Sequence, residues 1–245
     1  MEPNMTADEI SVVELRQYTL HPRQRDVLIG LFDREFVEPQ EAVGMAVLGQ
    51  FRDLDDPNRF VWLRGFTDMS SRHAGLSAFY GGPVWQAHAQ AANATMVDSD
   101  NVLLLQPAWP GAGLPYDPGH RAAQGAAATP AGRVDLTIFY LKEPASPDLL
   151  DFCRRRMAAI LAAGAALAQG WYITEPSENS FSRLPVREGE SVLVGCAVFS
   201  DAAALDAFER TGAWQRDIAP ALSQWLAREA EAHRLAPTAR SALHA

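Results

Sequence analysis

The chain has 245 residues, of which 48% are hydrophobic, and its formal net charge is −9. This is enough apolar material for one large core or two small ones. The acidic balance, without a basic cluster, excludes a general nucleic-acid binder. No apolar run reaches the ~18 residues of a membrane helix, and the polar N-terminal residues 1–10 are unlike a signal or transit peptide. We therefore expect a cytoplasmic protein with neither a nucleic-acid nor a membrane partner.

The first half of the chain, residues 10–108, predicts the order strand, helix, strand, strand, helix, strand. A helix follows Pro22, and a second helix begins at Asp68. The stretch DLDDPN (53–58) is rich in residues that favour turns, so it predicts a turn between the two middle strands. Apolar alternation places the four strands at residues 12–20, 45–51, 59–66 and 102–106.

The second half, residues 133–240, predicts the same order. Residues 109–132 are rich in Pro, Gly and Ala and are expected to be a linker between the halves. Ser146 and Pro147 form an N-cap and N1 signature for the first helix of this half. The predicted strands cover residues 133–141, 170–175, 191–199 and 233–236.

Four similar blocks recur in the same order in both halves. The longest pair is AFYGGPVWQ (78–86) and AFERTGAWQ (207–215). The other pairs are VELRQYTL with VDLTIFYL, GFTD with VFSD, and LQPA with LAPT. This repetition indicates two diverged copies of one module of about a hundred residues.

The repeated βαββαβ order is that of the ferredoxin-like unit. Its antiparallel sheet carries both helices on one face, so the other face must be covered. Two units packed sheet to sheet solve this problem. We therefore predict an α+β fold in which two tandem units form a barrel-like pseudo-dimer within one chain.

The opening of the first half resembles the NIPSNAP domain family. The similarity rests on an E-L-R-x-Y-T-L opening (14–20), a P-x-W-Q phrase (83–86) and an LLLxP ending (103–107). It is weaker in the second half, where Arg16, Tyr18 and Pro83 are replaced by Thr137, Phe139 and Gly212. The resemblance implies the dimeric α/β-barrel superfamily, which includes cofactor-free monooxygenases, small cyclases and isomerases, and haem enzymes.

Polar residues on the first strand of each copy are the main candidates for a site. Because side chains alternate along a strand, one face carries Glu14, Arg16 and Tyr18 in the first copy. The corresponding residues of the second copy are Asp135, Thr137 and Phe139. We expect the apolar faces of these strands to meet the helices, so that these six residues point into the barrel.

Two interpretations of these polar residues stay open. In the first, Arg16 holds an anion, Glu14 or Asp135 moves a proton, and Tyr18 donates a hydrogen bond in a ligand pocket. In the second, Glu14 and Arg16 form a structural ion pair.

The third strand adds an asymmetry between the copies. Trp62 and Arg64 share one face of this strand in the first copy, and the second copy has Gly195 and Ala197 there. If that face is interior, copy one is expected to fill the barrel while copy two leaves room for a ligand. Ordinary repacking is the alternative explanation.

The histidines give no metal signature. None has a second ligand at a diagnostic spacing, so no metal site is expected. His73 and His88 are candidates for haem ligation or proton transfer, because haem needs only one axial histidine. Trp85 and Trp214, which recur at equivalent places, are interpreted as core anchors of the second helices.

Three functional hypotheses follow. The first is a cofactor-independent oxygenase, cyclase or isomerase of biosynthesis that acts on an aromatic or polyketide-like compound. The alternatives are a non-catalytic protein that binds a small ligand or haem, and a scaffold protein of the NIPSNAP family. The sequence leaves a homodimer of such pseudo-dimeric chains open.

Overall fold

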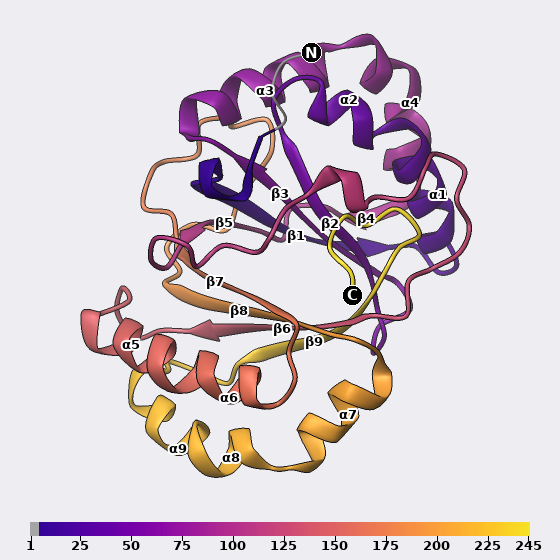
Figure 1. The fold of residues 1–245 in the computed structure, drawn as a ribbon. Helices are drawn as coiled ribbons and strands as arrows, with labels where there is room; N and C mark the ends of the chain where they lie inside the picture. Colours follow the sequence, from indigo (N-terminus) through magenta and orange to yellow (C-terminus); the bar gives the residue numbers. More distant parts are fainter. Residues whose placement is uncertain (1–4) are drawn as a thin grey trace.

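The computed structural model describes residues 5–245 and contains a closed antiparallel barrel of eight strands (Figure 1). The ring runs β3-β2-β9-β6-β8-β7-β5-β1 and closes by the pairing of β1 with β3, while short β4 pairs with the end of β1. The strands are β1 (Val12–Leu20), β2 (Ala46–Asp53), β3 (Arg59–Phe66), β4 (Met96–Asp98), β5 (Val102–Pro107), β6 (Arg133–Tyr140), β7 (Ala168–Thr174), β8 (Val192–Phe199) and β9 (Glu231–Pro237).

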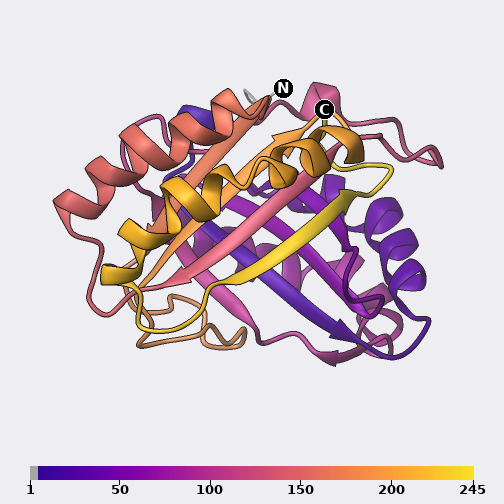
Figure 2. The same cartoon turned by 90° about the horizontal axis from the view of Figure 1, so that it is seen from below.

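The helices cover two opposite outer sides of the barrel (Figures 1 and 2). One side carries α1 (Arg25–Glu35), α2 (Val37–Glu41), α3 (Met69–Gly81) and α4 (Pro83–Asn93). The other carries α5 (Pro147–Phe152), a π-helical turn (Cys153–Met157), α6 (Ala158–Ala163), α7 (Ala202–Arg210), α8 (Ala213–Asp217) and α9 (Ala219–Leu222). None of the helices within residues 5–245 is both long and apolar enough to cross a bilayer.

Local sequence explains where these helices begin and end. The side chains of Asp68 and Asp201 cap α3 and α7 by accepting backbone N–H bonds, as Ser146 does for α5. The predicted second helix of each copy is broken in two at a glycine. Gly82 stands between α3 and α4, and Gly212, with φ of 59°, stands between α7 and α8.

The predicted pair of ferredoxin-like units is confirmed by the strand pairing. The first unit has the order β5-β1-β3-β2 and the second has β9-β6-β8-β7, so each sheet repeats the same connectivity. The sheets meet edge to edge, with β5 against β7 and β2 against β9. These two pairings close the barrel within a single chain.

The predicted direction of the side chains is wrong. Val13 and Leu15 belong to the core inside the barrel, together with Val134 and Leu136 of the second unit. Tyr18 packs instead in a separate core with residues of the first unit's helices. By strand alternation, Glu14, Arg16, Asp135, Thr137 and Phe139 also point toward the helices. The physical reason is that the closed interior offers few hydrogen-bond partners, whereas the helical layer supplies polar side chains.

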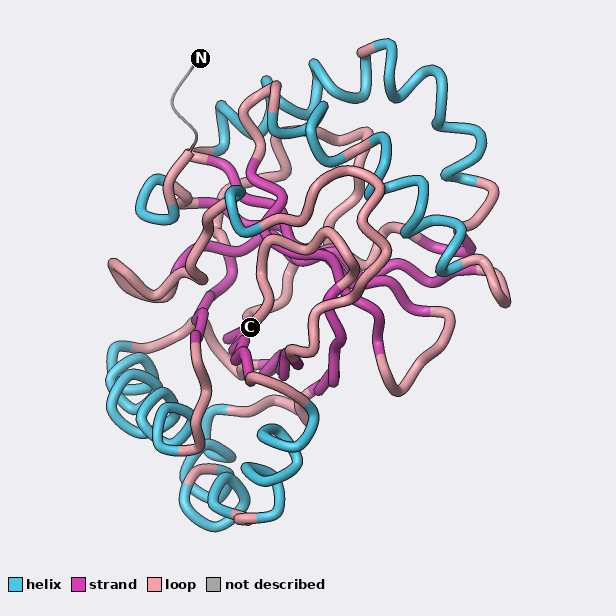
Figure 3. Tube along the Cα trace, turned by 45° about the vertical axis from the view of Figure 1, so that its right-hand side comes forward, coloured by secondary structure: helices cyan, strands magenta, loops and turns pink. Residues whose placement is uncertain are grey.

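The inside of the barrel is packed with side chains. Leu114 of the predicted linker and Leu243 near the C-terminus add to the core formed by the strands. The Leu114 backbone N–H donates to Tyr172 Oη over 2.8 Å, which fixes the linker against the second unit. Figure 3 shows the segment that ends at the C-terminus as a loop next to the strands. The part of the polar N-terminus formed by residues 1–4, used above to infer the compartment, lies outside the described residues.

A buried histidine joins the two units where β2 meets β9. His233 of β9 is 3% exposed, and its Nδ1 lies 2.8 Å from Asp53 Oδ2 of β2. Its Nε2 lies 3.1 Å from Glu231 Oε1. Burial alone would lower the pKa of His233, but the hydrogen bonds to the two carboxylates outweigh it and raise the pKa above 6.5.

We predict that His233→Gln destabilises the protein in a pH-dependent way. Because the folded-state pKa is raised, the stabilisation by His233 is complete below the unfolded-state pKa and is lost as pH rises through the folded-state value. Urea unfolding of wild type and variant at pH 5.5 should differ by ~3 kcal/mol. The difference should shrink toward pH 9, and a constant difference would contradict the charged pairing.

Candidate active site between the sheet and the helices

Each unit has an equivalent space between its sheet and its helices, and the strand register sets what lines it. Glu14 stands opposite Arg64 across β1 and β3, as Asp135 stands opposite Ala197 across β6 and β8. One step along, Arg16 stands opposite Trp62. The corresponding pair in the second unit is Thr137 and Gly195. The same positions therefore carry four large side chains in the first unit, three of them charged, and smaller side chains in the second.

In the first unit, the carboxylate of Glu14 is held by three guanidinium groups. Oε2 accepts from Arg16 Nη1 at 2.7 Å and from Arg64 Nε at 2.8 Å. Oε1 accepts from Arg72 Nε of α3 at 2.7 Å. Burial alone would raise the pKa of Glu14, but the charges of the arginines hold it well below its usual range. Glu14 is thus fixed as an anion and is unsuited to act as a base near neutral pH.

The predicted residues around Glu14 form a filled cluster. Tyr18 accepts from Arg16 Nε at 2.9 Å. The Trp62 ring lies 5.6 Å from the Arg16 guanidinium carbon and 5.1 Å from that of Arg64. The side chains of Glu14, Arg16 and Arg64 are at most 1% exposed. The structural interpretation of the Glu14–Arg16 pair therefore fits this unit better than an open pocket.

The second unit has an open pocket of about 260 Å³ at the equivalent place. It contains the three predicted residues of this unit, Asp135, Thr137 and Phe139. It lies between the strands and helices α6, α7 and α8. The full wall consists of Asp135, Thr137, Phe139, Leu161, Trp171, Gly195, Ala197, Phe208, Glu209, Trp214, Gln215, Ala230 and Ala232.

Asp135 is one of the two carboxyl groups that line this pocket, and Glu209 is the other. The Oδ1 of Asp135 lies 3.4 Å from Thr137 Oγ1, which donates a long hydrogen bond. Burial, together with the charge of Glu209, raises the pKa of Asp135 to about 6. The arginines keep Glu14 ionised, whereas Asp135 can gain and lose a proton near neutral pH.

Aromatic side chains form the walls around Asp135. Trp214 stacks on Phe139 with ring centroids 6.0 Å apart and an interplanar angle of 20°. Trp171 Nε1 donates to Gln169 Oε1 at 3.2 Å, which holds its ring in place. A Cβ added to Gly195 would meet the Trp171 ring at 2.7 Å. Glycine at this position therefore makes room for the Trp171 ring, which packs directly against it.

Several residues of the pocket wall were not among the predicted site residues. Trp214 was interpreted as a core anchor, but it also lines the cavity. Phe208, Glu209 and Gln215 come from the same repeated phrase, residues 207–215. In the first unit, Trp85 of the matching phrase packs against aromatic neighbours, as an anchor would. The repeat itself was the signal for these residues.

The histidine candidates lie outside this pocket. The His73 ring contacts the backbone oxygen of Ser180 through Nδ1, and His88 Nε2 lies 3.6 Å from Glu35 Oε2. The pocket wall contains none of the His, Cys, Met or Tyr side chains that ligate haem iron, so it does not fit haem. Within residues 5–245, no group of three or more His, Cys, Asp or Glu side chains is placed to hold a metal.

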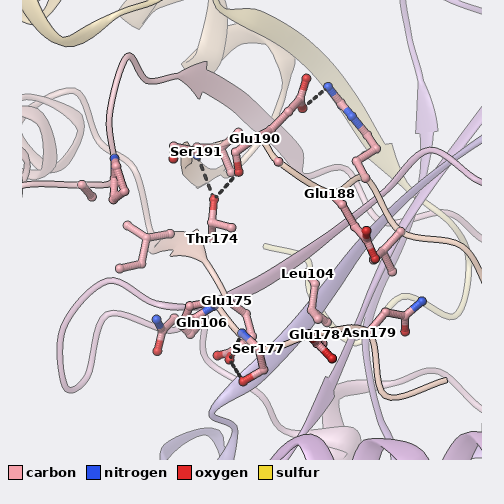
Figure 4. Close-up of a pocket in the computed structure, with 18 residues that line it drawn as sticks. Leu104, Gln106, Thr174, Glu175, Ser177, Glu178, Asn179, Glu188, Glu190 and Ser191 are labelled. Carbon is pink, nitrogen blue, oxygen red and sulfur yellow. Dashed lines mark hydrogen bonds and ion pairs between the residues drawn. The ribbon is translucent and has the colours of Figure 1, made fainter. Parts of the chain in front are cut away.

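A larger cavity, of about 770 Å³, lies beside the loop that connects β7 to β8 (Figure 4). Its wall includes four glutamates, among them Glu188 and Glu190, and the Thr174 hydroxyl bonded to the Glu190 backbone oxygen. None of the residues predicted as site candidates lines this cavity.

Comparison with known proteins supports the fold of both units. Residues 13–109, which span nearly all of the first unit, match the NIPSNAP family model. No curated protein is significantly similar to the chain.

Three solved structures share the fold over nearly the whole chain. A monooxygenase-like protein of Lactobacillus acidophilus NCFM has 10% identity and a TM-score of 0.60, with 95% of this chain and 97% of that chain covered. A second, from Fusobacterium nucleatum, has 9% identity and a TM-score of 0.59, with 94% and 93% covered. An anthrone oxidase-like protein has 14% identity and a TM-score of 0.60, with 99% of each chain covered. At these identities the likeness shows the fold alone.

Glu14→Gln is expected to destabilise the protein by ~3–5 kcal/mol, because it leaves buried arginine charges without their anion. Urea unfolding at pH 7 measures this loss. The exposed pair Arg155–Asp151 supplies the matched control, since Arg155→Gln should cost less than ~1 kcal/mol. Equal effects of the two substitutions would contradict the role given to Glu14.

Asp135→Asn is expected to stabilise the protein above pH 6. A raised carboxyl pKa means that ionisation disfavours the folded state, so wild type loses stability between the unfolded-state pKa near 3.8 and about 6. The variant escapes this loss and should be more stable by about 1–3 kcal/mol at pH 7.5. At pH 4 the two proteins should be alike. A destabilised variant at pH 7.5 would refute this.

Proposed function

We propose that the protein is a small-molecule enzyme in which Asp135 removes a proton from an aromatic or polyketide-like substrate. The observation that carries this proposal is the pairing of an open aromatic-walled pocket with a carboxyl group whose pKa is about 6. A general base works best when its pKa lies near the working pH. At pH 7 most Asp135 side chains are ionised, yet they remain basic enough to accept a proton.

The size and lining of the pocket suit a flat, mostly apolar substrate. A cavity of about 150 Å³ is known to accept benzene, so 260 Å³ has room for more than a single ring. Phe139 and Trp214 offer ring faces against which such a compound can lie. Solved proteins of the same fold are described as monooxygenases and as anthrone oxidase-like, and these descriptions agree with an aromatic or polyketide-like substrate.

The chemistry assigned to the residues is simple proton abstraction. The Asp135 carboxylate takes a proton from an acidic C–H or O–H group. Thr137 orients the carboxylate through its hydroxyl, and the Gln215 amide is a polar group of the wall able to donate to the enolate oxygen. The resulting enolate then reacts with oxygen in an oxygenase or with an electrophile of the same molecule in a cyclase. In an isomerase it takes the proton back from Asp135 at a different carbon.

Isotope exchange into anthrone tests the proton abstraction directly. Anthrone carries an acidic methylene group, and its exchange in D2O under anaerobic conditions is followed by proton NMR. Asp135→Asn is expected to slow the exchange catalysed by the wild type by ~10²–10⁴-fold. Equal rates for the two proteins, or no catalysis by wild type above the buffer rate, would overturn the proposal.

Glu209→Gln is the matched control, because it alters a carboxylate of the wall that is given no proton-transfer role. Since the Glu209 charge helps to raise the pKa of Asp135, this variant should keep the exchange activity. The midpoint of its pH–rate profile should fall below that of wild type. A loss of activity as large as that of Asp135→Asn would assign the base to Glu209 instead.

A further inference from the structure

The buried cluster of the first unit carries more positive than negative charge. Glu14 is the one carboxylate bonded to Arg16, Arg64 and Arg72 in the described part of the chain. The charges that act on Arg72 are an attraction to Glu14 and repulsions from Arg64 and Arg16. Buried charges that lack counter-charges are costly, so the cluster has an electrostatic preference for another anion.

Two hydrogen-bond donors without acceptors also indicate that the cluster could bind an anion. Arg72 Nη2 and Trp62 Nε1 are buried and have no hydrogen-bond partner among the described residues. Arg72 itself is 0% exposed. A buried N–H group without an acceptor costs free energy, and an incoming oxyanion would supply that acceptor.

The loop between β7 and β8 covers this cluster from the second unit. Arg72 Nη1 donates to Asn179 Oδ1 and to Ser180 Oγ, each at 3.0 Å. Phe181 stacks on Tyr80 with ring centroids 6.1 Å apart and an angle of 28°. The Asn179 and Ser180 oxygens accept from Arg72 as the carboxylate of an aromatic acid would. The Phe181 ring lies on Tyr80 as the aromatic ring of that acid would. The loop therefore resembles a ligand bound in place.

The loop between β7 and β8 is fixed at both ends and irregular between them, as expected of a segment that can move about its ends. Its ends are fixed by backbone bonds from Glu175 to Leu104 and from Arg187 to Val102, over 2.9 and 2.8 Å. The stretch between them contains no helix or strand, and the whole connection exceeds the ~12–15 residues of ordinary loops. The cavity of about 770 Å³ lies along its side and includes Asn179 in its wall (Figure 4).

We propose that the first unit holds a second ligand site, which binds a small aromatic carboxylate through Arg72 and Tyr80 when residues 179–181 swing away. The carboxylate would accept from the Arg72 guanidinium, whose planar fork matches it. The aromatic body would take the place of the Phe181 ring. This site is separate from the Asp135 pocket and does not depend on the function proposed for it.

Calorimetric titration with benzoate tests the site, with neutral benzamide and inorganic phosphate as comparison probes. Phe181→Ala removes the competing ring and should bind benzoate at least tenfold more tightly than wild type. Glu178→Gln, a change at an exposed position of the same loop, should leave the affinity unchanged. Arg72→Met should abolish binding, and Asp135→Asn should leave it intact, which separates this site from the catalytic pocket.

Limited proteolysis reports the movement of the loop. Saturating benzoate should speed tryptic cleavage after Arg183, which is exposed within the loop, but not after Arg155 in the second unit. The proposal is overturned if Phe181→Ala binds benzoate no better than wild type, or if Asp135→Asn abolishes binding. Equal binding of benzamide, or binding of phosphate in place of benzoate, would also overturn it.

Discussion

The arrangement depends on the two edge pairings, β5 with β7 and β2 with β9, that close the two sheets into one barrel. Water does not reach the closed interior of the barrel, so a polar group there would lose its hydrogen bonds to water. The interior must therefore be apolar and well packed. Val13, Leu15, Val134 and Leu136 meet that demand. The polar residues of the same strands are therefore forced onto the outer faces, beneath the helices. Both candidate sites are consequences of that division.

The two units share their strand connectivity but differ in the chemistry of equivalent positions. Glu14 is balanced by arginines on β1, β3 and α3, whereas Asp135 has small neighbours at the matching strand positions. The first environment lowers a carboxyl pKa and the second raises it. Equivalent strand positions thus hold an ion-pair anchor in one half and a candidate base in the other.

Much of the fold could be predicted from the sequence, because its signals are local or repeated. Strand alternation, the capping aspartates and the recurrent Trp-Gln phrase were sufficient for two βαββαβ units. The asymmetry of Trp62 and Arg64 against Gly195 and Ala197 also indicated which unit keeps room, but the pocket lies beneath the helices and not inside the barrel, where it was expected. The sequence did not predict which face of each strand points into the barrel. Both faces of β1 are buried, and periodicity alone does not say which one meets the helices. The contact of Asn179 and Ser180 with Arg72 was equally hidden, since it joins segments more than a hundred residues apart through an irregular loop.

The covalent connection between the units has a thermodynamic consequence. In a barrel assembled from two separate chains, the edge pairings form only on association, so the folded fraction depends on protein concentration. Here residues 109–132 join the two sheets, and the linker residue Leu114 packs inside the barrel. Closure is intramolecular, and its loop entropy replaces the translational entropy of association. The barrel therefore persists at dilutions that would separate a two-chain counterpart.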